Sequence, residues 1–211
     1  LAAAACVAVS DCHTPDSLAD RESFMGLLVA GVLLWMAVHL PKAAAPDLRD
    51  AAVARFGANG WRSFVSLALV GALVLMILGY RSATPAMAYR PPDWGHGAGS
   101  VVAVIGMILF VASVPRTNIK RYVRHPQLLS VVLWAAGHLL AGGSWPGIVL
   151  LGGLGLWAIL EIRAINRRDG AWQRPEPAPR KADVIVLAGG LALSVVAIAV
   201  HHWRGIPVIA G

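Results

Sequence analysis

Long apolar runs alternate with short polar segments along the chain from residue 24 onward. Each run has about 17–20 residues, the length that an α-helix needs to cross the hydrocarbon core of a bilayer. Backbone groups in lipid must be hydrogen-bonded internally, so each run is predicted to be a helix. The predicted spans cover residues 24–40, 62–80, 98–115, 126–142, 145–161 and 183–201. We therefore expect an all-α polytopic membrane bundle of about six transmembrane helices.

Short signals in the connecting segments separate these runs. Residues 42–60 contain a predicted amphipathic helix, which ends in the sequence Gly-Ala-Asn-Gly at residues 57–60. A tight turn at residues 142–144 joins the fourth and fifth runs, and Pro146 suits the first turn of the helix that follows. Residues 173–181 read QRPEPAPRK, and this proline-rich segment is expected to be an extended linker.

The basic residues indicate how the predicted spans are oriented. Fourteen of the 18 Lys and Arg residues lie in the segments that follow the first, third and fifth spans. Cytoplasmic loops of membrane proteins carry an excess of Lys and Arg. Because the basic segments are alternate loops, we expect them on the cytoplasmic side of the membrane and both chain termini outside.

Composition agrees with a membrane protein and excludes a soluble domain. Hydrophobic residues make up 57% of the chain and charged residues 14%, against about 25% charged residues in soluble domains. Loops that face anionic lipid explain the net charge of +7, so membrane lipid is an expected partner and nucleic acid is not. Residues 1–24 are expected to be an N-terminal extension, disordered or translated from an upstream start. A membrane domain at 25–203 and a tail at 204–211 follow it.

Two predicted spans carry the same pattern, W-x-A-x-H-L. The first copy contains Trp35 and His39, and the second contains Trp134 and His138. In each copy the Trp precedes the His by four residues, so both side chains lie on one helical face. A His within a membrane is costly without a partner, which makes it a candidate functional residue. Two imidazoles beside flat aromatic rings suit a haem or another flat ligand; two hydrogen-bonded core histidines are the alternative.

Polar residues near the predicted inner surface form a second candidate site. Arg124 and His125 precede Pro126 at the start of the fourth span, where a helix N-terminus can receive an anionic or planar cofactor. Glu161 ends the fifth span and could pair with this group from the same side. Three further histidines are expected on the solvent side or at the membrane interface: His96, His201 and His202.

These motifs resemble the NnrU family of bacterial inner-membrane proteins, whose genes are associated with denitrification. The resemblance rests on LRDAAVARFGANGWRSFVSLALVGALVLMILGYR and RHPQLLSVVLWAAGHLLAGGSW, and covers most of residues 25–170. Plant and cyanobacterial zeta-carotene isomerase, a haem b enzyme with histidine ligands, is similar to this family. The resemblance therefore implies haem b with His39 and His138 as ligands, and a membrane protein of the denitrification system as a partner. Ala135 stands where that enzyme has a cysteine.

The predicted topology sets a test for this ligand pair. His39 lies near the inner end of the first span, whereas His138 lies thirteen residues past the inner end of the fourth. At 1.5 Å per residue, His138 is about 20 Å deep. One iron can bind both only if the spans are shifted from these bounds; otherwise His39 pairs with His125.

Two alternatives stay open at this point. The sequence Arg124-His125-Pro126 also resembles the helix start of isoprenylcysteine and phospholipid methyltransferases, which implies S-adenosylmethionine as the cofactor. Those enzymes usually carry two glutamates after the next helix, and this chain has one, Glu161. A non-enzymatic membrane scaffold is the other alternative, with the glycine-rich fifth and sixth spans as its contact faces. The residues do not decide whether the protein is an enzyme.

Overall fold

The computed structural model describes residues 18–206 and 208. The predicted N-terminal extension lies outside the described residues as far as position 17, and helix α1 begins at Leu18. The described part of the chain forms no strand, only an isolated bridge between Met87 and Ser144. In chain order the elements are α1 (Leu18–Ala44), α2 (Pro46–Ser82), α3 (Gly95–Ala112), the 3-10 helix η1 (Asn118–Arg121), α4 (Pro126–Ala141), α5 (Trp145–Gly147), the π-helical turn η2 (Ile148–Gly152), α6 (Gly153–Asp169) and α7 (Arg180–Trp203).

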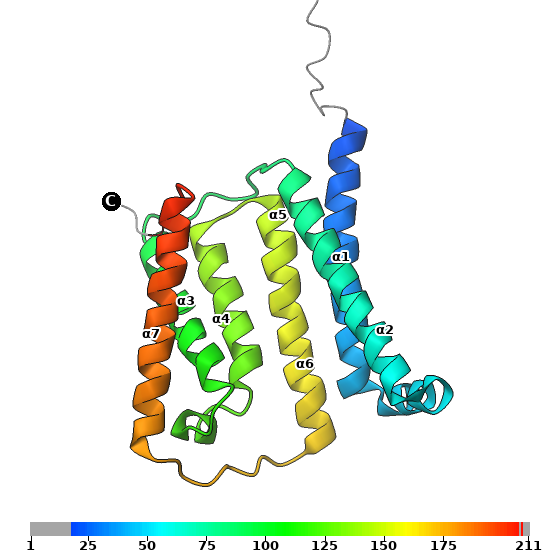
Figure 1. The fold of residues 1–211 in the computed structure, drawn as a ribbon. Helices are drawn as coiled ribbons and strands as arrows, with labels where there is room; N and C mark the ends of the chain where they lie inside the picture. Colours follow the sequence, from blue (N-terminus) through cyan, green and yellow to red (C-terminus); the bar gives the residue numbers. More distant parts are fainter. Residues whose placement is uncertain (1–17, 207, 209–211) are drawn as a thin grey trace, which may run out of the picture.

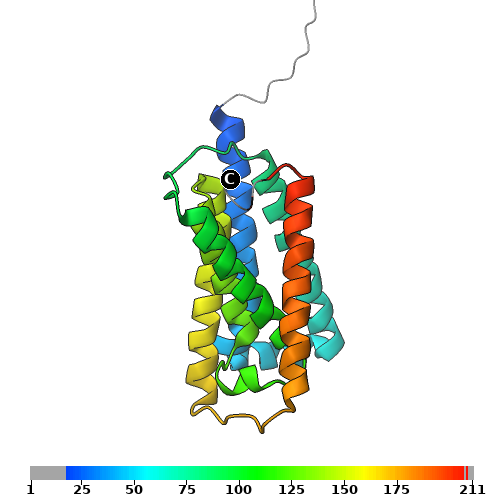
Figure 2. The ribbon, with the colours of Figure 1, turned by 90° about the vertical axis from the view of Figure 1, so that its left-hand side faces the viewer.

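The long helices form an antiparallel bundle. α1 packs on α2 and α3 packs on α4, while α6 contacts both α1 and α4, and α7 packs on α3. Figure 1 shows this spatial order, from α2 on the right to α7 on the left. Figure 2, seen from the α7 side, shows α3 running at a tilt beside α7. α4 and α7 each pack on α3 but make few contacts with each other.

Within the described part of the chain, five helices are long and apolar enough to cross a membrane: α1, α2, α3, α7 and the continuous helix Trp145–Asp169. α4 has 16 residues and is about 24 Å long, which is less than the roughly 30 Å of a bilayer core. The prediction of an all-helical, multi-pass membrane protein is therefore confirmed. Six full-length spans are not confirmed, and the outward orientation of both termini stays a prediction.

The three basic segments meet at one end of the bundle. The basic residues of these segments lie at positions 42–62, 116–124 and 163–181, and the helix ends within these ranges lie at the bottom of Figure 1. This shared position agrees with the predicted alternation of basic and non-basic loops. We refer to this end as the basic end and to the other as the opposite end.

Local sequence signals set several helix boundaries. Gly57 interrupts α2 with φ 75° and ψ 160°, so a short helix at residues 46–56 precedes the membrane-spanning part, as predicted. Gly adopts this positive φ without the strain that a Cβ atom would introduce. Pro126 occupies the first turn of α4. The Ser144 hydroxyl accepts a hydrogen bond from the Gly147 N–H at 3.2 Å and caps the next helix.

Glycines allow α4 and α7 to approach α3 closely. A Cβ atom at Gly99 of α3 would lie 2.4 Å from the carbonyl oxygen of Gly137 in α4. A Cβ atom at Gly190 of α7 would lie 2.7 Å from the Cα atom of Ile108 in α3. Small residues at such contacts let membrane helices pack backbone to backbone. α3 therefore fixes the positions of α4 and α7 relative to each other.

The fifth predicted span contains a turn that its sequence did not predict. α5, η2 and α6 form one continuous helix, and its Ile148–Gly152 segment is π-helical. π-helical turns inside α-helices are rare and often lie at functional sites. Leu151 of this turn lines a cavity of the bundle.

Candidate functional site

A cavity of about 400 Å³ lies between α3, α4 and α7. Most of its wall consists of apolar or small side chains, such as those of Ala103, Met107, Leu151 and Ile198. Three histidines also line it, one from each helix: His96, His138 and His201. α3 begins at the opposite end of the bundle, and α4 and α7 finish there. The antiparallel order of the helices therefore brings these imidazoles together.

His138 and His201 approach each other across this cavity. Their ring centroids are 6.2 Å apart, and the ring planes are tilted by 47°. Nδ1 of His138 lies 2.8 Å from the Trp134 carbonyl oxygen, and Nδ1 of His201 lies 2.8 Å from the Ala197 carbonyl oxygen. A carbonyl only accepts, so in a neutral ring Nδ1 donates the proton and Nε2 keeps its lone pair. Metal-binding histidines commonly have this arrangement.

The second W-x-A-x-H-L motif supplies two rings to the cavity. Trp134 lines the cavity with His138, and the two ring centroids are 5.2 Å apart. Trp134 and His138, which are four residues apart, therefore lie on one face of α4, as predicted. An indole beside the imidazole adds a flat apolar surface to the polar group.

Two serine hydroxyl groups at this cavity are hydrogen-bonded to backbone carbonyls. The Ser100 hydroxyl lies 2.8 Å from the carbonyl oxygens of His96 and Val208, and the buried Ser194 hydroxyl donates to the Gly190 carbonyl at 2.8 Å. The contact with Val208 also joins the end of the described chain to α3. The histidines are therefore the cavity groups best able to bind a metal centre.

His39 lies in different surroundings, between α1 and α6. Its ring centroid is 4.5 Å from that of Trp35 and 4.7 Å from that of Trp157, and its Nδ1 is 3.0 Å from the Trp35 carbonyl oxygen. Glu161 is 7% exposed and follows Trp157 by one turn of α6, on the same helical face. The first motif is thus part of an aromatic contact between two helices.

The structure does not bring His39 and His138 into one site. α6 and its π-helical turn contribute Leu151 to the cavity of His138 and Trp157 to the contact of His39. These two residues are six positions apart on one helix, or about 9 Å along its axis. α1 packs mainly on α2 and α6. The ligand pair implied by the resemblance stays a prediction.

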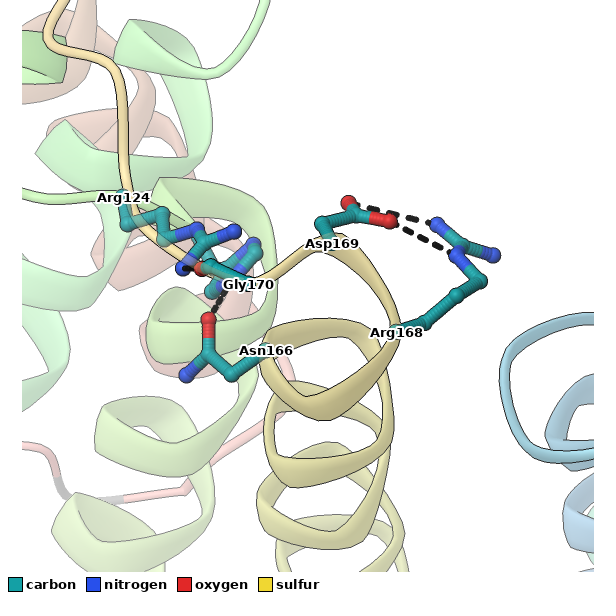
Figure 3. A network of polar contacts seen from close by, with 6 residues as sticks. Arg124, Asn166, Arg168, Asp169 and Gly170 are labelled. Carbon is teal, nitrogen blue, oxygen red and sulfur yellow. Dashed lines mark hydrogen bonds and ion pairs between the residues drawn. The ribbon is translucent and has the colours of Figure 1, made fainter.

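Arg124 and His125 join the start of α4 to the end of α6, at the basic end. Nε2 of His125 lies 2.8 Å from Oδ1 of Asn166, and the Arg124 guanidinium donates to the Gly170 carbonyl at 2.9 Å. Figure 3 shows Arg124 at Gly170, just after the end of α6, and Asn166 in the last turn of that helix. This site lies at the other end of α4 from His138, and its bonds hold two helices together.

The cavity contains two residues that sequence reasoning did not assign to a site. His96 and His201 were expected on the solvent side and at the interface, and both line the cavity. The predicted topology already held a signal, since the third span starts on the side where the fourth and sixth spans end. Among residues 18–206 and 208 no group of three or more His, Cys, Asp or Glu side chains is arranged to hold a metal ion.

The fold and this site together define a multi-pass helical membrane protein with a histidine-lined cavity near one end of its bundle. The family model described as NnrU protein matches residues 27–208, which is most of the chain. The protein belongs to the NnrU family. No curated protein and no solved structure matches the chain.

Proposed function

We propose that this protein binds haem b in the cavity between α3, α4 and α7. The observation that supports this proposal is a cavity of about 400 Å³ with an apolar wall and a histidine from each of three helices. Cofactor sites typically have volumes of about 300–1,000 Å³ and a few well-placed polar groups. Haem iron in proteins is commonly bound by histidine, and His138 belongs to the motif, to the family resemblance and to this cavity.

The residues of the chain fit the group that the proposal requires. A ligand imidazole must be neutral, with a lone pair on the nitrogen that faces the metal. The Trp134 carbonyl accepts from Nδ1 of His138 at 2.8 Å and so leaves Nε2 free of its proton. Trp134 and the apolar wall would cover the porphyrin. An apolar shell of this kind limits the access of water and so affects the reduction potential of the iron. Bound haem would supply one-electron chemistry or an iron site for a small ligand.

The proposed setting is the bacterial inner membrane, in association with the nitrite and nitric oxide reductase system. Membership of the NnrU family supports this setting. Either an assembly role or an isomerase-like redox reaction would use a haem held within the membrane. A denitrifying host without its own copy should regain growth on nitrite when it expresses the wild-type chain. If that host grows no better with the wild-type chain than without it, the role in denitrification is contradicted. Haem binding is tested separately, by the absorption spectrum.

The direct test of haem binding is the absorption spectrum of the full-length protein purified in mild detergent. We expect a Soret band and saturable one-to-one binding of added haemin. The His138→Ala variant should bind haemin at least tenfold more weakly, while His202→Ala, which changes an exposed histidine, should bind like the wild type. A wild-type protein that remains colourless after reconstitution with haemin would refute the proposal.

The methyltransferase alternative places S-adenosylmethionine near Arg124 and His125. Both side chains are engaged in the α4–α6 junction, with Gly170 and Asn166, so this geometry adds nothing in its favour. Titration of the purified protein with S-adenosylmethionine in a calorimeter should give no binding heat. A saturable signal lost in His125→Ala would favour the methyltransferase over haem.

A further inference from the structure

We infer that His138 of α4 and His201 of α7 would together hold the iron of one haem. This inference rests on the proposed haem function and names a ligand that neither the motif nor the family resemblance supplies. The ring centroids of the two histidines are 6.2 Å apart, and both rings line the same cavity.

The separation of the two rings matches bound imidazoles on opposite sides of one metal. A metal–nitrogen bond is about 2.0 Å, and the centre of an imidazole lies about 1.1 Å behind its nitrogen, so two such ligands have ring centres about 6 Å apart. The distance of 6.2 Å between the ring centres of His138 and His201 agrees with this value, and it also lies in the range of ordinary ring contacts.

The hydrogen bonds of both rings suit this role. Nδ1 of each histidine lies 2.8 Å from the carbonyl oxygen four residues earlier, of Trp134 in α4 and of Ala197 in α7. These bonds fix the ring orientation and the tautomer in which Nε2 binds the metal. The two rings therefore have the same tautomer when both are neutral.

The helix packing explains how the distance is maintained. α4 and α7 make few contacts with each other, and each packs on α3. The close approach of Gly137 to Gly99 fixes α4, and that of Gly190 to Ile108 fixes α7. The cavity is the space between α4 and α7 that remains, so a flat group bound there would bridge two helices that otherwise hardly touch.

His39 and His96 are weaker candidates for the second ligand. The ring of His39 is in contact with the rings of Trp35 and Trp157, at 4.5 and 4.7 Å, and His39 does not line the cavity. His96 lines the cavity, but it stands at the second position of α3, and no ring contact joins it to His138 or His201 among the described residues. Among the described histidines, only His201 both lines the cavity and has a ring contact with His138.

The test uses the full-length protein reconstituted with haemin in detergent, with spectra of the ferric and ferrous forms. The wild type should show a six-coordinate, low-spin spectrum. His201→Ala should retain haem at reduced affinity and become high-spin, and added imidazole should restore the low-spin form. His39→Ala, in the first W-x-A-x-H-L motif, and His202→Ala, next to His201, are the matched controls. Both should keep the wild-type spectrum. Size-exclusion chromatography and circular dichroism verify the fold of each variant.

A second variant keeps the test decisive where His201→Ala does not fold. His201→Met replaces one nitrogen ligand by a thioether, which raises the reduction potential of a haem, and we expect a higher midpoint potential than in the wild type. An unchanged potential and spectrum in His201→Met would overturn this ligand assignment while haem binding stands. Conversion to high-spin in His39→Ala alone would overturn it as well. A wild-type protein that binds no haemin would overturn the proposed function and the ligand pair together.

Discussion

Replacing Gly99 by Ala tests the contact that positions α4 beside the cavity. The added Cβ would lie 2.4 Å from the Gly137 carbonyl oxygen, and ordinary contacts begin at 3.4 Å. The α3 and α4 backbones must therefore separate by about 1 Å, since a backbone carbonyl cannot rotate away as a flexible side chain can. Gly97, two residues earlier in α3, is the matched control because a Cβ there meets nothing within 4 Å.

The two variants should change stability in opposite directions. Overpacking a tight contact costs about 1–3 kcal/mol, and we take about 3 kcal/mol for a clash with backbone. Ala in place of Gly returns about 1 kcal/mol through its higher helix propensity. Gly99→Ala should therefore lower the free energy of unfolding by about 2 kcal/mol, and the midpoint temperature by about 4–8 °C in a chain of this size. Gly97→Ala should be unchanged or more stable by up to about 1 kcal/mol.

Unfolding by SDS in mixed micelles, followed by circular dichroism, measures the difference between the variants. A thermal melt of the same samples gives the midpoint temperatures. Gly99→Ala should also bind haemin more weakly than Gly97→Ala, because a shift of α4 moves His138 relative to His201. Equal stability of the two variants would show that α3 and α4 do not approach at Gly99, and the argument from helix packing would fail.

Further changes test the polar junctions, the kink and the topology. Asn118→Ala removes the amide that bonds to Asp183 at 2.7 Å and joins η1 to α7; we expect a loss of about 1–3 kcal/mol in SDS unfolding. Gly57→Ala places a Cβ at φ 75° and should cost about 1–2 kcal/mol, with faster proteolysis around the kink. Asp93→Cys and Glu176→Cys each place a single cysteine at an exposed position. An impermeant maleimide should label Asp93→Cys from outside the cell and Glu176→Cys from the cytoplasmic side.

Each of these changes has a control in the same region. Gln127→Ala changes an exposed amide on α4 and should leave stability within about 0.5 kcal/mol. Gly71→Ala lies in the same helix as Gly57, where a Cβ meets nothing within 4 Å, and should not destabilise. The labelling requires Cys6 and Cys12 to be replaced by Ser, because they are the chain's two cysteines. Labelling of both new cysteines from the same side would contradict the alternating topology.

Helix positions could be predicted from the sequence because lipid allows few backbone structures. Apolar length predicted each helix, and local residues predicted boundaries such as the break at Gly57 and the start of α4 at Pro126. α4 has 16 residues, which is too short for a helix that crosses the whole bilayer core. The π-helical turn at Ile148–Gly152 had no sequence signal, since the same apolar pattern fits an α-helix.

The partner of His138 could not be predicted because the repeated motif carries no information about which helices are neighbours. Trp and His four residues apart share a face on any helix. The motif at Trp35 and His39 therefore matches the motif at Trp134 and His138, but this match does not show that the two helices are neighbours. Topology narrows the choice to residues at the same end of the bundle, which favours His201 over His39. The final selection depends on where glycines let α4 and α7 approach α3, and such backbone contacts between helices appear only in three dimensions.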